Sequence, residues 1–306
     1  MISIITEGVK ARKHLIPHSI PIDSFVLPRV VRQGTRCIAV GEHADLWLGN
    51  MSTEDGGSLV VALKQLRKGI IEKPSEPKGQ INEGLRRYVQ VAHTLDHPHV
   101  VRVIGLSGIN EPAPYLILLL FSNGDIVRFL KQNPGKTDDE KIELAKGVLA
   151  GLAYLHRLGI IHGSVHSKNA LVDDAGGAVL CDATFNSMIG EDDYSTISSK
   201  WWWMPHERLI VDDDADDGCA VASPSEAADV YEAALTIAQM WTLRRPFYNM
   251  RDEYALIIML RQLKMGQLAQ LDQPEEVPAG VWTILQDCLS LEPQARPTAE
   301  ELLARF

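Results

Sequence analysis

Short apolar runs separated by turn residues dominate the first 121 residues of the chain. Five of these runs are rich in β-branched or apolar residues and predict strands: Arg36–Val40, Asp45–Gly49, Ser58–Lys64, Val100–Gly105 and Tyr115–Phe121. Thr53–Gly57 separates the second run from the third as a hairpin turn, which makes them antiparallel neighbours. A helix is predicted over residues 79–95. The pattern therefore predicts a small antiparallel sheet with one inserted helix.

The hydrophobic spacing changes to a helical one after Gly124. Apolar residues that recur on one helical face predict a long helix: Ile142, Ala145, Val148, Leu149, Leu152 and Leu155. Thr137 and Glu140 form a capping box at its start. Further helices are expected at Ser225–Trp241, Asp252–Met265, Ala279–Leu289 and Thr298–Phe306, with short strands at Ala170–Val172 and Val179–Cys181. The order predicts an α+β protein with a strand-rich lobe followed by a helix-rich lobe.

Length and composition exclude several classes of protein. The chain has 306 residues, of which 45% are hydrophobic, so it can bury a substantial core. Its longest wholly apolar run, Leu116–Phe121, is far shorter than the roughly 20 residues that cross a bilayer, so we expect no membrane span. Scattered cysteines without a CxxC pair disfavour a disulfide framework or a zinc site: Cys37, Cys181, Cys219 and Cys288. Together these features predict an intracellular protein, cytoplasmic or nuclear.

The charge of the chain is unevenly distributed. There are 30 basic and 40 acidic residues, a formal net charge of −10, which disfavours bulk nucleic-acid binding. Residues 1–35 are basic, whereas residues 191–217 are strongly acidic. The acidic segment is either a solvated loop or the docking face for a basic protein partner.

Six motifs occur in a definite order along the chain: Val61-Ala62-Leu63-Lys64, His162-Gly163-Ser164, Asp182, Met204-Pro205-His206-Glu207, Asp229-Val230-Tyr231 and Ala295-Arg296-Pro297-Thr298. This ordered set resembles the protein kinase family over residues 36–306, and is most similar to its tyrosine-kinase-like serine/threonine branch. The resemblance implies two lobes, residues 36–121 and 122–306. Residues 1–35 form a basic extension without an assigned role.

The resemblance also implies candidate ligands, ATP and magnesium. Lys64 matches the lysine that holds the nucleotide phosphates, and Asn169 and Asp182 match the magnesium ligands. Gly41 is the one glycine kept in the loop that covers the phosphates, so we expect weakened phosphate contact. Leu46, Ala62 and Leu171 match the apolar positions above and below adenine, although ordinary core residues would look the same. Leu118 and Leu120 match the connection between the lobes, whose backbone would hydrogen-bond adenine.

Several positions depart from the family pattern in ways that affect catalysis. Ser164 stands where an aspartate accepts the proton of the substrate hydroxyl, and losing such a base typically slows a reaction by ~10²–10⁴-fold. His166 replaces a lysine and is the candidate substitute base. Tyr88 replaces the glutamate that fixes Lys64, and Glu83 points to another helix face. Ala183 replaces a phenylalanine that packs beneath the inserted helix, so we expect this hydrophobic contact to lack a large side chain.

Residues that support the fold are kept, in contrast to those that support catalysis. Glu207 and Arg296 match a buried ion pair, and Asp229 matches the residue that ties down the catalytic loop. The run Trp201–Trp203 either packs the activation segment or forms a docking surface. The sequence favours a catalytically impaired kinase-like domain, a pseudokinase that binds a protein partner. The alternative is a weak or atypical serine/threonine protein kinase that uses ATP.

Overall fold

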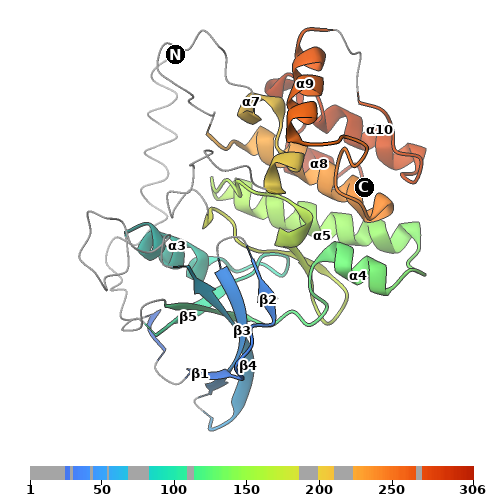
Figure 1. The fold of residues 1–306 in the computed structure, drawn as a ribbon. Coiled ribbons are helices and arrows are strands. Elements are labelled where there is room, and N and C mark those ends of the chain that lie inside the picture. The colour runs from blue at the N-terminus through green and yellow to red at the C-terminus, as the bar shows by residue number, and fades with distance from the viewer. Residues whose placement is uncertain are drawn as a thin grey trace. The chain divides into compact units, whose positions relative to one another are not determined.

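A computed structural model describes residues 25–27, 30–41, 44–53, 55–67, 83–108, 114–185, 199–209, 223–266 and 271–306 (Figure 1). These residues divide into two compact units, each with its own hydrophobic core. The first unit runs to Phe121 and also includes Phe185. The second unit comprises Ser122–Thr184 and the described residues from 199 onward. No helix among the described residues is both long enough and apolar enough to cross a membrane.

The first unit is built on an antiparallel sheet of six described strands, in the order β1-β3-β4-β6-β5 with β2 paired to β3. The strands are β1 (Val30–Gln33), β2 (Ala39–Val40), β3 (Ala44–Ser52), β4 (Ser58–Leu66), β5 (Val103–Ser107) and β6 (Tyr115–Leu119). Ser52 pairs with Ser58, so the predicted hairpin between β3 and β4 is confirmed.

Two strands differ from the sequence prediction at the start of this sheet. The predicted strand Arg36–Val40 is reduced to Ala39–Val40, because residues 34–36 bend and Gly34 has a φ of 70°. The structure instead adds β1, which the apolar pattern did not indicate and which pairs with the far half of β3. Two short strands therefore replace the single predicted one.

Helix α3 (Glu83–Thr94) packs against β5 through one apolar face. The buried residues of this face recur at helical spacing: Leu85, Tyr88, Val89 and Ala92. On the same strand, a Cβ at Gly105 would lie 2.5 Å from the carbonyl oxygen of Phe25. Only glycine therefore allows the N-terminal segment to approach β5, where Val26 bridges Leu106 in parallel.

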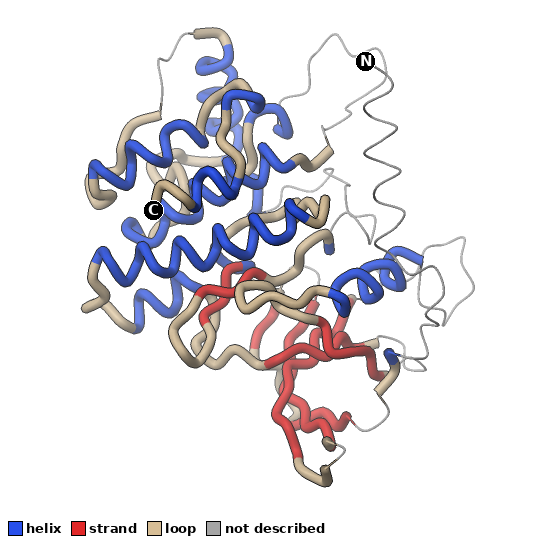
Figure 2. The backbone as a smooth tube through the Cα atoms, turned by 180° about the vertical axis from the view of Figure 1, so that it is seen from behind, coloured by secondary structure: helices blue, strands red, loops and turns tan. Residues whose placement is uncertain are grey.

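Helices make up most of the second unit, as the blue segments of Figure 2 show. They are α4 (Ile126–Gln132), α5 (Asp138–Arg157), α7 (His206–Leu209), α8 (Glu226–Thr242), α9 (Glu253–Lys264), α10 (Ala279–Cys288) and α11 (Ala299–Leu303), with the hairpin β7 (Ala170–Val172) and β8 (Ala178–Leu180). The capping box of Thr137 and Glu140 is present as predicted. The α+β fold, with a sheet lobe and a helical lobe, is confirmed.

Candidate functional site

Side chains of α8 hold the loop that contains His162. Asp229 accepts hydrogen bonds from the backbone N–H groups of His162 and Gly163, both at 2.8 Å. Its carboxylate is fully buried and lies 2.9 Å from Nε2 of His156. The predicted role of Asp229, to tie down the backbone of this loop, is confirmed.

A second buried carboxylate on the same helix was not predicted. Glu232 accepts a hydrogen bond from the N–H of Val165 at 2.7 Å and pairs with Arg208 at 2.9 Å, with both side chains 2% exposed. Thr236 donates to the carbonyl of Val165 at 3.1 Å. Burial raises the pKa of Glu232 to about 7, although the Arg208 guanidinium opposes the rise. One face of α8 carries Asp229, Glu232 and Thr236, because residues three and seven positions apart lie on the same side of a helix. This spacing in the sequence could have indicated that Glu232 and Thr236 contact the same loop as Asp229.

Ser164, at the predicted base position, lies inside this clamped loop. The residue is 6% exposed, and its hydroxyl oxygen is buried without a hydrogen-bond partner among the described residues. Its backbone N–H donates to Nδ1 of His162 at 3.3 Å, and burial lowers the pKa of that histidine. Since the hydroxyl forms no hydrogen bond with a described base, none of the described residues activates it as a nucleophile or proton acceptor.

His166, the candidate substitute base, lies on the same loop and is partly buried. Its ring centroid is 5.7 Å from that of Trp203. Burial lowers the pKa of His166 to about 3, and the positive potentials of His162 and Lys168 act in the same direction. The imidazole is therefore neutral near pH 7, and so low a pKa makes it a poor proton acceptor.

The two predicted metal ligands lie at the ends of the β7–β8 hairpin. Asn169 uses its amide nitrogen to donate to the carbonyl of Ser164 at 3.0 Å, which leaves the amide oxygen towards Cys181, 3.9 Å from Sγ. Asp182 follows Cys181 directly and adds a carboxylate. An amide oxygen and a carboxylate are the donors that magnesium takes in proteins, so these residues fit the ion. When bound there, magnesium would neutralise charge on nucleotide phosphates.

The backbone after β8 has an unusual conformation. Asp182 and Thr184 both have positive φ, 62° and 61°. Aspartate tolerates the left-handed region, whereas a β-branched threonine is strained in it. The Thr184 hydroxyl is also buried without a partner among the described residues, while its N–H donates to the carbonyl of His162 at 2.8 Å. Thr184 therefore has a backbone conformation that suits glycine better than a β-branched residue.

In the first unit, the strand register gathers the predicted nucleotide-facing residues. Ala62 and Lys64 lie on one face of β4 because side chains alternate along a strand. Leu46 is directly opposite Lys64, and Leu118 is directly opposite Ala62, so all four share that face. Leu120 follows the end of β6, and Leu171 lies in β7 of the second unit.

The environment of Lys64 corrects one expectation. Its ammonium lies 4.0 Å from the ring centroid of Phe185, and that ring packs edge-on against Tyr88 at 5.0 Å. The contact beneath α3 that Ala183 was expected to leave short is thus filled by Phe185, which is 2% exposed. An aromatic side chain two residues further along the chain replaces the missing phenylalanine. The side chain of Glu83 lies outside the described residues.

The turn that contains Gly41 is closed by its own hydrogen bonds. The N–H of Gly41 donates to the carbonyl of Ala44 at 2.8 Å, and the carbonyl of Gly41 accepts from Arg67 at 2.7 Å. Arg67 also contacts Asp45 at 3.3 Å. The N–H that a phosphate would use is therefore already occupied. Glu42 and His43 lie outside the described residues.

Two further predictions concern the second unit. Arg296 grips Glu207 with two hydrogen bonds of 2.6 and 2.9 Å, so the predicted ion pair is confirmed. Of the tryptophan run, Trp202 and Trp203 are buried, and Trp202 donates to Glu253 at 3.1 Å. These two side chains pack within the unit, as one of the two interpretations expected. The acidic positions 191–193 and 212–217 lie outside the described residues.

Comparison with known proteins agrees with this arrangement. A sequence model of the protein tyrosine and serine/threonine kinase family matches residues 33–306, and the chain belongs to that family. Ephrin type-A receptor 5 of Homo sapiens is 22% identical over 88% of this chain and 24% of its own length. Discoidin domain-containing receptor tyrosine kinase B of Caenorhabditis elegans is 25% identical over 90% and 33%. A probable serine/threonine-protein kinase of Dictyostelium discoideum is 24% identical over 98% and 42%. The chain therefore spans less than half the length of each of these relatives.

Proposed function

We propose that this chain is a pseudokinase domain, a catalytically impaired regulatory or protein-binding module of the kinase family. The observation that carries the proposal is the state of Ser164, whose hydroxyl is buried and has no hydrogen-bond partner among the described residues. A serine hydroxyl is not a base near neutral pH, and this one has no described neighbour that would make it one. His166, with its depressed pKa, does not supply the missing base.

The environment of the nucleotide-facing residues supports weakened ATP binding rather than its loss. Asn169 and Asp182 offer oxygen donors for magnesium, and Lys64 shares a strand face with Ala62 and Leu118. Against this, the N–H of Gly41 is committed to Ala44. We therefore include residual binding of ATP and magnesium in the proposal.

The remaining parts of the proposal concern partners, location and domain division. A basic protein is the proposed partner, with the acidic positions of residues 191–217 as its docking face, in a cytoplasmic setting. We propose lobes at residues 36–121 and 122–306 with a basic extension at 1–35. The end of that extension contributes β1 to the sheet of the first lobe.

A weak serine/threonine protein kinase is the second candidate. The observation that favours it is the intact pair of oxygen donors, Asn169 and Asp182, together with the intact clamp of Asp229 on the loop. Both would be needed to position a transferring phosphoryl group.

The test is transfer of radiolabelled γ-phosphate from ATP to generic protein substrates, with Lys64→Met as the control. A pseudokinase gives no transfer above that control, whereas sustained transfer that Lys64→Met abolishes would establish the weak kinase. Thermal unfolding tests ATP retention separately, since ATP at 100 times its Kd stabilises the folded state by about 2.7 kcal/mol. Pulldown with the intact chain, and with the aspartates of 212–217 changed to asparagine, tests the docking face.

A further inference from the structure

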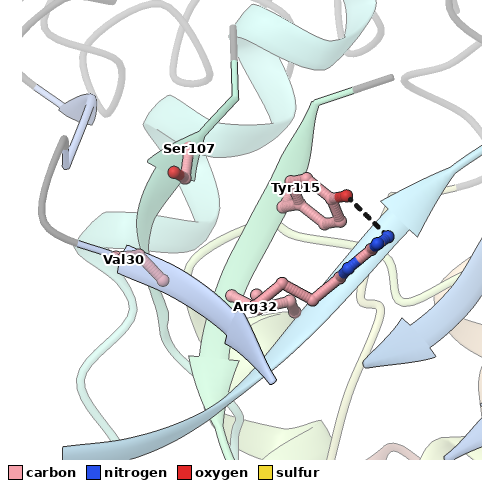
Figure 3. Close-up of a pocket in the computed structure, with 5 residues that line it drawn as sticks. Val30, Arg32, Ser107 and Tyr115 are labelled. Atoms are coloured by element: carbon pink, nitrogen blue, oxygen red, sulfur yellow. Dashed lines mark hydrogen bonds between the residues drawn. The ribbon is translucent and has the colours of Figure 1, made fainter. Parts of the chain in front are cut away.

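The face of the sheet opposite the one that carries Lys64 contains a cavity of about 220 Å³. Figure 3 shows its lining: Val30 and Arg32 from β1, Ser107 from β5 and Tyr115 from β6, with Leu63 of β4 completing it. Leu63 alternates with Lys64 along β4, which places the two on opposite faces. The cavity is therefore distinct from the candidate nucleotide site.

Three of the residues that line this cavity carry hydrogen-bond donors. The Tyr115 hydroxyl accepts from Gln65 at 3.1 Å and from Arg32 at 3.4 Å, so its own O–H remains to be donated. The Ser107 hydroxyl makes no hydrogen bond to the described residues. The Arg32 guanidinium stacks 4.2 Å above the Trp47 ring, an attraction that consumes none of its N–H groups. Arg32, Ser107 and Tyr115 thus each bring a donor to the lining of one cavity.

The charge of the lining residues also favours an anionic ligand. None of the five lining residues is acidic, and no carboxylate of the described residues pairs with Arg32. Tyr115 and Leu63 form a buried floor, 7% and 2% exposed, whereas Arg32 lies at the exposed edge of the cavity. A guanidinium beside two hydroxyl donors suits a carboxylate, which it can hold with two parallel hydrogen bonds.

We propose that this cavity is a binding site for a small carboxylate with a short hydrocarbon chain. The carboxylate would lie between Arg32, Ser107 and Tyr115, and the chain would lie against Val30 and Leu63. Pockets for drug-sized ligands occupy roughly 300–1,000 Å³, so this smaller cavity excludes a nucleotide or a large lipid. The proposal does not depend on whether the domain transfers phosphate.

Calorimetric titration of the full chain with hexanoate, at constant ionic strength, tests the proposal. We expect saturable binding with one site per chain, weakened about tenfold or more by Arg32→Gln, because hydrogen bonds to charged groups are lost. The matched control Arg36→Gln removes the same charge from another exposed position, outside the lining, and should leave the Kd within about twofold. Hexanol, which lacks the charge, should bind about tenfold more weakly or worse.

Two further measurements keep the result decisive if Arg32→Gln fails to fold. Tyr115→Phe keeps the ring in the core but removes the hydroxyl, and should also weaken hexanoate binding. The indole N–H resonance of Trp47, assigned with Trp47→Phe, should shift on titration because the ligand reorients Arg32 above it. Absence of saturable hexanoate binding, equal affinity of Tyr115→Phe and the unchanged chain, or equal binding of hexanol or inorganic phosphate would each overturn the proposal.

Discussion

The ammonium of Lys64 lies over the ring of Phe185, 4.0 Å from its centroid, and the same ring meets Tyr88 edge-on. A cation above an aromatic face is attracted to the electron-rich π system, and edge-to-face rings attract each other in addition to burying area. Phe185 thus links the lysine of β4 to the helix α3. In the family pattern a glutamate of this helix fixes that lysine, and Tyr88 occupies its position.

Replacing Phe185 with leucine tests this arrangement. We expect the variant to lose about 1–3 kcal/mol of unfolding free energy, because it loses both aromatic contacts but keeps most of the apolar volume. Chemical denaturation measures the loss. A double-mutant cycle with Tyr88→Leu isolates the ring pair, with an expected coupling of about 0.5–1.5 kcal/mol. A coupling near zero would mean that the two rings do not stabilise each other.

Replacing the strained Thr184, which follows β8, should raise the unfolding free energy, unlike the replacement of Phe185. Thr184→Gly should stabilise the chain by about 1 kcal/mol, since it relieves a positive φ and removes a buried hydroxyl without a partner in the described region. Gly159→Ala is the matched control: its φ is 67° with open space around the Cβ position, so alanine there should cost about 1 kcal/mol. A destabilised Thr184→Gly would show that the threonine side chain makes a compensating contact.

Replacing only one member of the buried ion pair of Arg208 and Glu232 should lower the unfolding free energy strongly. Arg208→Met leaves the Glu232 carboxylate buried without its cation, and removing one partner of such a pair costs about 3–5 kcal/mol. Arg208→Met combined with Glu232→Leu should recover part of this loss. Arg157→Met, which breaks an exposed pair with Glu300, should change stability by less than about 1 kcal/mol. Equal losses in the two single variants would refute a special role for the buried pair.

The lowered pKa of His166 leads us to expect that the folded state loses stability below about pH 6.5. Its folded pKa of about 3 lies below the unfolded value of 6.5, so the unfolded chain binds the extra proton between these pH values. Stability attributable to this ring is therefore complete above pH 6.5 and decreases as the pH falls, by about 2 kcal/mol between pH 7 and 5.

Comparison with His166→Gln isolates this contribution. The variant should show a shallower decrease in unfolding free energy over the same pH range. Glu232, whose pKa is raised, contributes an opposite trend, but it does so equally in both proteins. Subtracting one pH profile from the other therefore removes the Glu232 contribution. Parallel pH profiles for the two proteins would show that His166 titrates normally in the fold.

The sequence predicted those parts of the molecule that depend on local pattern. The hairpin β7–β8 and the capped helix α5 follow from turn residues and periodicity. The roles of Asp229, Glu207 and Arg296 were implied by the resemblance of their motifs to the kinase family. The short helix α4 was missed because its seven residues begin with two β-branched side chains, although Asp125 caps it.

Features that depend on tertiary contacts were not predictable in this way. The packing of Phe185 against Tyr88 joins residues almost a hundred positions apart in the sequence. The pairing of Arg208 with Glu232 joins residues 24 positions apart on different helices, and β1 is specified by its pairing with β3 rather than by its own composition. Sequence pattern describes one element at a time, whereas these contacts are made between elements.

The most direct measurement of the central claim is the turnover of ATP itself, because it assumes nothing about the protein substrate. Radiolabelled γ-phosphate, released or transferred, is counted per mole of chain with magnesium present, for the unchanged protein, Ser164→Ala and Lys64→Met. The pseudokinase account predicts that all three remain indistinguishable and below one phosphate per chain. Several turnovers by the unchanged protein that disappear in Lys64→Met would contradict it.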